Sequence, residues 1–230
     1  MTTRAAQKLQ TRNALMDAAH LLMSDGRGFG SLSLREITRN AGIVPAGFYR
    51  HFSDMNAFGL ALVAEVGDTF RDTLRRVRHH EVELQGVIEA SVGIFLDAVA
   101  EHHRHFLFLA REQYGGSHPI RQAIADLRQH ITDDLAADLF QLNRLPHLTR
   151  QDLDVVADLV VKTVFATLPE LIDTPSAVTA PHLTPQAKII HQLRFVMIGA
   201  KHWHGMDTFS APSKCIETPT ASSVHHKAAN

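Results

Sequence analysis

The chain has 230 residues and a formal net charge of −1, with 23 Lys and Arg against 24 Asp and Glu. This length is enough for one small domain and one larger, well-packed domain. The single cysteine, Cys215, excludes an intrachain disulfide framework, and charged residues interrupt every apolar run before it could cross a membrane. We therefore expect a cytoplasmic protein with no signal peptide and no membrane partner.

The first predicted helix spans about residues 5–24. Its apolar side chains recur at helical spacing on one face: Leu15, Ala18, Ala19 and Leu22. Basic residues open this helix, and three glycines between positions 26 and 30 end it in a turn. We expect it to brace the segment that follows.

Residues 33–52, SLREITRNAGIVPAGFYRHF, predict two short helices joined by a glycine turn. Ser33 and Glu36 have the spacing of a capping box, which starts the first helix. Gly42 ends that helix without a steric penalty, and Pro45 suits the first turn of a second helix that runs to about His51.

The second helix of this pair carries residue types that suit contact with DNA. Its small or apolar start allows close approach to base edges, while Tyr49, Arg50 and His51 can donate to phosphates or bases. A hairpin that merely packs is the alternative, but packing does not require these polar side chains at the exit. Residues 1–52 also hold seven Lys and Arg against three Asp and Glu. The predicted contacts on the two helices are Ser33, Arg35, Val44, Pro45, Ala46, Gly47, Tyr49, Arg50 and His51.

Residues 32–52, LSLREITRNAGIVPAGFYRHF, resemble the helix-turn-helix of TetR-type transcriptional regulators. The SLSLRE opening, the FYRHF exit, a LARE segment and a C-terminal QLR…GA helix followed by Trp are similar to the fatty-acid biosynthesis repressors FabR and DesT. The family usually has Lys or Arg shortly after the H-F pair, where this chain has Asp54, Met55 and Asn56. Asn56 is the predicted DNA contact that replaces it.

The resemblance implies an all-α, TetR-like chain with an N-terminal three-helix DNA-binding domain at 1–53 and a larger helical ligand-binding and dimerisation domain at 54–206. Residues 207–230 are rich in Ser, Thr, Pro and Ala and lack periodicity, so we expect a mobile tail there. The resemblance further implies a homodimeric repressor, not an enzyme, that binds a palindromic operator in double-stranded DNA. Its implied effector is a long-chain acyl-CoA or acyl carrier protein thioester, and its targets are genes of unsaturated fatty-acid biosynthesis.

Helical periodicity continues after the predicted DNA-binding segment. An apolar stripe from Phe58 to Val77 predicts a long helix that contacts both the predicted DNA-binding domain and the domain that follows it. No segment alternates as a strand does, so the residues themselves also predict an all-α chain. The remaining helices are expected at about 88–99, 105–112, 120–139, 153–171 and 189–203.

Small residues on the last two predicted helices allow another helix to approach closely. The resemblance places the dimer interface on these two helices, whereas the alternative is a core within one chain. A dimer would also double the contact with DNA. The small residues concerned are Ala157, Ala166, Gly199 and Ala200.

The middle helices carry more aromatic and aliphatic surface than one helix face buries, which suits a pocket for a hydrophobic effector. Arg111 and Glu112 directly follow the most apolar run and are its candidate polar groups. The alternative is that the aromatics are plain core and that Arg111 and Glu112 form an internal ion pair, and the residues alone favour it as much as the pocket. The resemblance favours the pocket. The predicted ligand-binding residues are Phe95, Phe106, Leu109, Arg111, Glu112, Phe165, Phe195 and Trp203.

Sixteen histidines raise the question of a metal site. They cluster at 102–105 and 202–204, but neighbouring histidines point to different faces of a helix, and no ligand set has the spacing of a metal site. We therefore expect no metal and no resident cofactor, and no catalytic motif is recognisable. Two other functions stay open: a TetR-type regulator of efflux or catabolic genes responding to another hydrophobic molecule, and a helical carrier or enzyme that keeps the head only for docking.

Overall fold

The computed structural model describes residues 3–24, 26–78, 86–173 and 184–205. Within these ranges all regular secondary structure is helical, which confirms the predicted fold class. The α-helices are α1 (Arg4–Ser24), α2 (Leu34–Asn40), α3 (Pro45–Phe48), α4 (Met55–Arg78), α5 (Val87–Glu101), α6 (His103–Glu112), α7 (His118–Gln141), α8 (Arg150–Asp173) and α9 (Pro185–Lys201). A short 3₁₀ helix, Phe29–Ser31, links α1 to α2.

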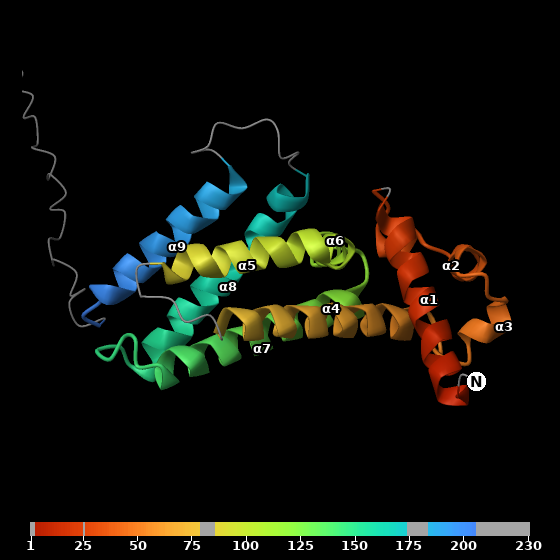
Figure 1. The fold of residues 1–230 in the computed structure, drawn as a ribbon, viewed down its shortest axis with the longest axis horizontal. Coiled ribbons are helices and arrows are strands. Elements are labelled where there is room, and N and C mark those ends of the chain that lie inside the picture. Colours follow the sequence, from red (N-terminus) through yellow and green to blue (C-terminus); the bar gives the residue numbers. More distant parts are fainter. Residues whose placement is uncertain (1–2, 25, 79–85, 174–183, 206–230) are drawn as a thin grey trace, which may run out of the picture.

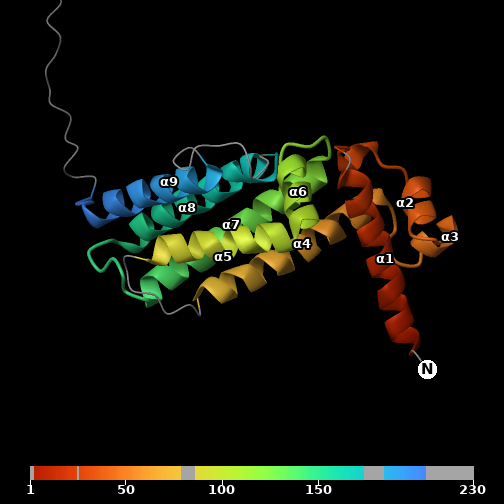
Figure 2. The ribbon, with the colours of Figure 1, turned by 45° about the horizontal axis from the view of Figure 1, so that its top comes forward.

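The helices form a small head at one end of an elongated body. In both views α1, α2 and α3 gather at that end, and α4 runs from them along the body beside α5 and α7 (Figure 1, Figure 2). The short helix α6 lies at the junction and packs against α1, α4 and α8. No helix in the described ranges is long and apolar enough to cross a membrane.

The head folds around local signals that the sequence predicted. The capping box is present, since the Ser33 hydroxyl accepts from the Glu36 N–H and the Glu36 carboxylate accepts from the Ser33 N–H. Gly42 has φ +67°, a left-handed conformation that favours glycine, and it turns the chain between α2 and α3. Phe48, Phe52 and Phe58 then pack as a buried aromatic trio with ring centroids 4.7–5.4 Å apart.

Two helix ends differ from the expected bounds. The α-helical part of α3 ends at Phe48, because the next N–H groups bond three residues back: Arg50 to the Gly47 carbonyl at 3.3 Å and His51 to the Phe48 carbonyl at 2.9 Å. The last helix ends at Lys201, so Trp203 lies beyond it. The predicted tail from 207 onward lies outside the described residues.

The apolar core runs without a break from the head into the body. The buried α4 residues Phe58 and Leu62 pack within the head, and Phe70 continues the same cluster as far as Leu168 of α8. The predicted boundary after residue 53 therefore falls at the start of α4, while the core itself is shared. A movement in the body thus has a packed route to the head.

Candidate nucleic-acid interface

The outer edge of the head presents α3 and the turn that follows it (Figure 1). Val44, an apolar residue, is 71% exposed, and Tyr49, an aromatic residue, is 61% exposed, although such side chains are usually buried. Pro45, Ala46 and Arg50 are also exposed. The structure therefore brings the predicted small-residue face and its polar exit together on one solvent-facing edge.

Gly47 and His51 are half-buried in this edge. A Cβ added to Gly47 would lie 2.6 Å from Cγ2 of Ile43, so any larger residue here would displace the Ile43 side chain. Burial lowers the pKa of His51, and the positive charges of Lys8, Arg12 and Arg50 lower it further. His51 is therefore largely uncharged at neutral pH.

The start of α1 contributes to the same surface. Besides acting electrostatically on His51, Arg12 places its guanidinium 4.7 Å from the centroid of the Phe52 ring. This cation–π contact holds a basic side chain beside the exit of α3. The sequence showed that basic residues open this helix but gave no sign that Arg12 would contact Phe52.

The two remaining predicted contacts on α2 have different roles. Arg35 is exposed, whereas the hydroxyl of Ser33 is engaged in the capping box. Arg27 joins this cap through an ion pair to Glu36 at 3.0 Å. Hydrogen bonds from Arg27 and Ser33 lower the pKa of Glu36 to about 2. Ser33 thus positions α2 by its side chain.

Asn56 lies exposed in the first turn of α4. Next to it, Asp54 accepts a hydrogen bond from the Ala57 N–H at 2.8 Å and so caps α4. This bond, with one from Ser53, lowers the pKa of Asp54. The acidic residue that departs from the family pattern therefore serves as the N-cap of α4.

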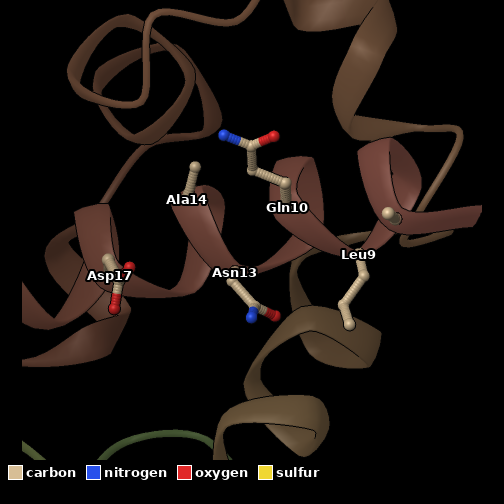
Figure 3. A pocket seen from close by; sticks show the side chains of 6 residues that line it. Leu9, Gln10, Asn13, Ala14 and Asp17 are labelled. Carbon is tan, nitrogen blue, oxygen red and sulfur yellow. The ribbon is translucent and has the colours of Figure 1, made fainter. Parts of the chain in front are cut away.

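A shallow hollow lies along α1 (Figure 3). All of its lining side chains come from this single helix, whereas small-molecule pockets usually enclose a ligand between several elements. The hollow therefore does not match the predicted effector site. Its lining residues are Ala6, Leu9, Gln10, Asn13, Ala14 and Asp17.

Three of the predicted effector-binding aromatics meet in the body. Phe95, Phe106 and Phe165 are buried around Phe70, with ring centroids 5.4–6.0 Å from it, and Leu109 is buried in the same cluster. The rings fill the space between α4, α5, α6 and α8. In this conformation they form core.

The other two aromatics lie elsewhere. Phe195 is 79% exposed on α9, and the Trp203 indole N–H donates to Asp152 at 2.9 Å. The hydrogen bonds of Thr149 and Trp203 to Asp152 lower the pKa of this carboxyl. Neither aromatic belongs to the cluster around Phe70.

Arg111 and Glu112 reach from α6 to the head. Arg111 donates to the carbonyl oxygen of Met23, in the last turn of α1, at 2.7 Å. Glu112 is buried and accepts from the Phe29 N–H at 2.7 Å. These two residues therefore tie α6 to the end of α1 and to the 3₁₀ helix between α1 and α2.

A group that sequence reasoning missed lies at the same junction. His20 of α1, Glu65 of α4 and His105 of α6 bring their polar atoms within 4.8 Å of one another. Burial, together with neighbouring His20, lowers the pKa of His105. No local pattern reveals this cluster, because each residue comes from a different helix.

Two family models cover most of the chain. Residues 15–62 match the model described as bacterial regulatory proteins, tetR family, and residues 84–199 match that of the tetracyclin repressor-like C-terminal domain. The chain belongs to the TetR family. Its members are transcriptional regulators, not enzymes, and membership implies binding to operator DNA and dimerisation.

Solved TetR-type structures share the fold at low sequence identity. FadR, a fatty acid degradation regulator from Bacillus halodurans, has a TM-score of 0.65 at 12% identity, covering 84% of this chain and 97% of its own. A TetR-family regulator from Streptomyces coelicolor has a TM-score of 0.62 at 19% identity, covering 84% and 96%. A TetR-like regulator from Rhodococcus sp. RHA1 has a TM-score of 0.60 at 20% identity, covering 86% and 100%.

Proposed function

We propose that this TetR-family protein is a repressor whose homodimer binds a palindromic operator through α3 and the turn to His51. The observation that carries this proposal is the exposed edge on which small apolar residues precede Tyr49, Arg50 and His51. Small residues let the helix enter the major groove, and the polar exit supplies donors to phosphates and bases. The basic start of α1 adds charge beside it.

The dimer interface is proposed on α8 and α9. Each helix exposes large apolar side chains, which single-chain surfaces usually bury or scatter. Ala166 and Gly199 lie on the exposed side, whereas Ala157 and Ala200 are buried within the chain. A four-helix contact would cover this surface and place two α3 helices about one DNA turn apart. The exposed large residues are Val155, Leu159, Phe195 and Ile198.

We assign a long-chain acyl thioester, acyl-CoA or acyl carrier protein, as the effector, and unsaturated fatty-acid biosynthesis genes as the targets. The sequence likeness to FabR and DesT supports this assignment, as does the cluster of buried aromatic and aliphatic side chains around Phe70. FadR, with the same fold, is described as a regulator of fatty acid degradation. The alternative is a regulator of efflux or catabolic genes that responds to another hydrophobic molecule.

The effector signal would travel through α6. An acyl chain can enter the packed cluster only by displacing Phe106 or its neighbours, which moves α6. Arg111 and Glu112 would pass that shift to the end of α1 and to Phe29. This shift would give the head two positions relative to the body. The effector changes DNA binding only if it binds the protein with different affinity in these two states.

The test starts by selecting operators from a random duplex library with the full-length protein. We expect a two-fold symmetric site with half-sites about one helical turn apart. Fluorescence anisotropy then measures affinity for the selected duplex with and without palmitoyl-CoA or oleoyl-CoA. Selection of no symmetric sequence would overturn the operator proposal. Unchanged affinity at saturating acyl-CoA and acylated carrier protein would overturn the effector proposal and favour the alternative.

A further inference from the structure

Three helices bring one polar side chain each to a single point between head and body. Nε2 of His20 lies 3.1 Å from Oε2 of Glu65, and Nε2 of His105 lies 3.6 Å from the same oxygen. The two imidazole rings lie edge to face with centroids 4.7 Å apart. We propose that His20, Glu65 and His105 bind a divalent transition-metal ion such as Zn²⁺.

The spacing of the three atoms suits this ion. Zinc bonds to imidazole nitrogen and carboxylate oxygen are about 2.0–2.2 Å long, so neighbouring ligand atoms of a tetrahedral site lie about 3.3–3.5 Å apart. The two measured distances to Glu65, 3.1 and 3.6 Å, lie on either side of this range. All three atoms already lie within 4.8 Å, so small side-chain rotations complete the arrangement. Three protein ligands leave a fourth position for water or an exchangeable ligand.

The surroundings orient His105 for this role. The Thr69 hydroxyl donates to the Glu65 carbonyl at 3.3 Å and lies 3.4 Å from Nδ1 of His105. With its proton engaged, the hydroxyl accepts from Nδ1–H, which leaves a lone pair on Nε2. That lone pair faces Oε2 of Glu65, so the two electron-rich atoms repel each other. A cation bound between Nε2 and Oε2 would accept a lone pair from each and remove this repulsion.

His20 depends on the same point for its polar contact. Its ring is 3% exposed, and within the described residues its Nδ1 is buried without a hydrogen-bond partner. The interaction made by Nε2 is therefore the one that offsets the free-energy cost of burying this imidazole. A metal–nitrogen bond supplies it more strongly than one hydrogen bond to half-buried Glu65.

The site has a regulatory consequence, which rests on the proposed function. An ion held by α1, α4 and α6 would fasten the head to the effector side and favour one orientation of α3. Metal and acyl ligand would then act on the same two-state element, and each would change the affinity for the other. Metal binding itself does not depend on this consequence.

The test measures metal binding to the full-length protein without DNA. Protein treated with EDTA and desalted is titrated with Zn²⁺ against a chromophoric chelator, and with Co²⁺, whose visible absorption reports tetrahedral coordination. We expect one ion per chain in the chelator competition. Glu65→Gln and His105→Gln should each weaken binding at least about 100-fold, and Thr69→Val about 10-fold as an outer-shell change. His103→Gln, an exposed neighbour on α6, is the matched control and should bind as the unchanged protein does.

Circular dichroism verifies that each variant is folded. If His105→Gln does not fold, the near-isosteric Glu65→Gln alone tests the metal site. Zinc binding that is equal in the unchanged protein and Glu65→Gln would overturn the proposal, as would the absence of tetrahedral Co²⁺ absorption. Loss of the ion in the cluster variants, with unchanged affinity for a selected operator, would keep the metal site and remove its regulatory role. Failure to select any operator would not affect the metal result.

Discussion

Individual side chains at the exit of α3 determine how strongly the head holds DNA. Arg50 is exposed beside Tyr49 and has no competing role in the head core. Arg50→Ala should weaken operator binding about 10- to 100-fold, because one phosphate or base contact is lost in each half of the dimer. Anisotropy with the selected duplex measures the change. Arg144→Ala, an exposed arginine in the α7–α8 connection, is the control, and equal weakening by both changes would contradict this role.

His51 should make operator binding depend on pH. Burial and the charges of Lys8, Arg12 and Arg50 lower its pKa in the free protein, whereas a nearby phosphate raises it in the complex. Binding then takes up a proton, so affinity should rise as pH falls from about 7.5 to about 5.5. Anisotropy at several pH values should show a smaller rise for His51→Gln. Identical pH profiles would assign the effect to other groups.

The cap of α2 should make stability of the head sensitive to acid. The pKa of Glu36 is lowered to about 2 by hydrogen bonds from Arg27 and Ser33. Its contribution is therefore complete above the usual carboxyl range and is lost as pH falls from about 4.5 toward about 2. Urea unfolding at pH 5 and pH 3 should show that Glu36→Gln destabilises the protein more at pH 5. An equal loss at both pH values would contradict this sign.

The same cap has a second test at Ser33. Ser33→Ala removes the hydroxyl that accepts from the Glu36 N–H and should cost about 1 kcal/mol of unfolding free energy. Ser31→Ala changes an exposed hydroxyl that bonds within the preceding turn and is the matched control. Urea unfolding at neutral pH compares them, and equal effects would show that the cap contributes nothing special.

Besides α4, which runs from the head into the body, α6 also joins the two parts by packing against α1. Arg111→Ala would leave the Met23 carbonyl without its charged donor and should destabilise the protein by about 1–3 kcal/mol. Arg104→Ala removes an exposed arginine from the same helix and should have little effect. Urea unfolding measures both. If the two variants unfold alike, α6 is not held to α1 through this bond.

Most elements could be predicted from local patterns, because a helix is determined by residues near one another in sequence. The Ser33–Glu36 cap, the turn at Gly42 and the apolar stripe through Phe58 each have a local cause. What brings separate helices together has no such pattern. The contacts of Arg111 and Glu112 with the head could therefore not be deduced.

The metal cluster shows the same limit more strongly. Sequence reasoning considered histidines that are neighbours along the chain, yet His20 and His105 meet only because α1 packs against α6. Conversely, aromatic character alone places Phe195 with Phe165 in the predicted effector site, although Phe195 is exposed on α9. Residue type suggested these sites, and only tertiary packing decides which members meet.

At the scale of the whole molecule, the exposed apolar face of α8 and α9 should hold the dimer. Phe195→Asp places a charge at its most exposed aromatic residue, and two-fold symmetry repeats the change in the partner. The dissociation constant of the dimer should rise at least about 100-fold. Light scattering after size exclusion measures the mass. Leu142→Asp, an exposed apolar site at the C-terminal end of α7, is the control and should leave the dimer intact. A dimer that survives Phe195→Asp would contradict the assignment.

Two chains together should bind one operator through their α3 edges and respond to an acyl thioester. Native mass spectrometry of the full-length protein with the selected duplex, with and without oleoyl-CoA, measures both properties at once. We expect two chains per duplex, an acyl-CoA retained by the dimer, and a changed fraction of bound duplex when acyl-CoA is present. One chain per duplex, equal binding to a scrambled duplex, or a bound fraction indifferent to retained acyl-CoA would contradict these expectations.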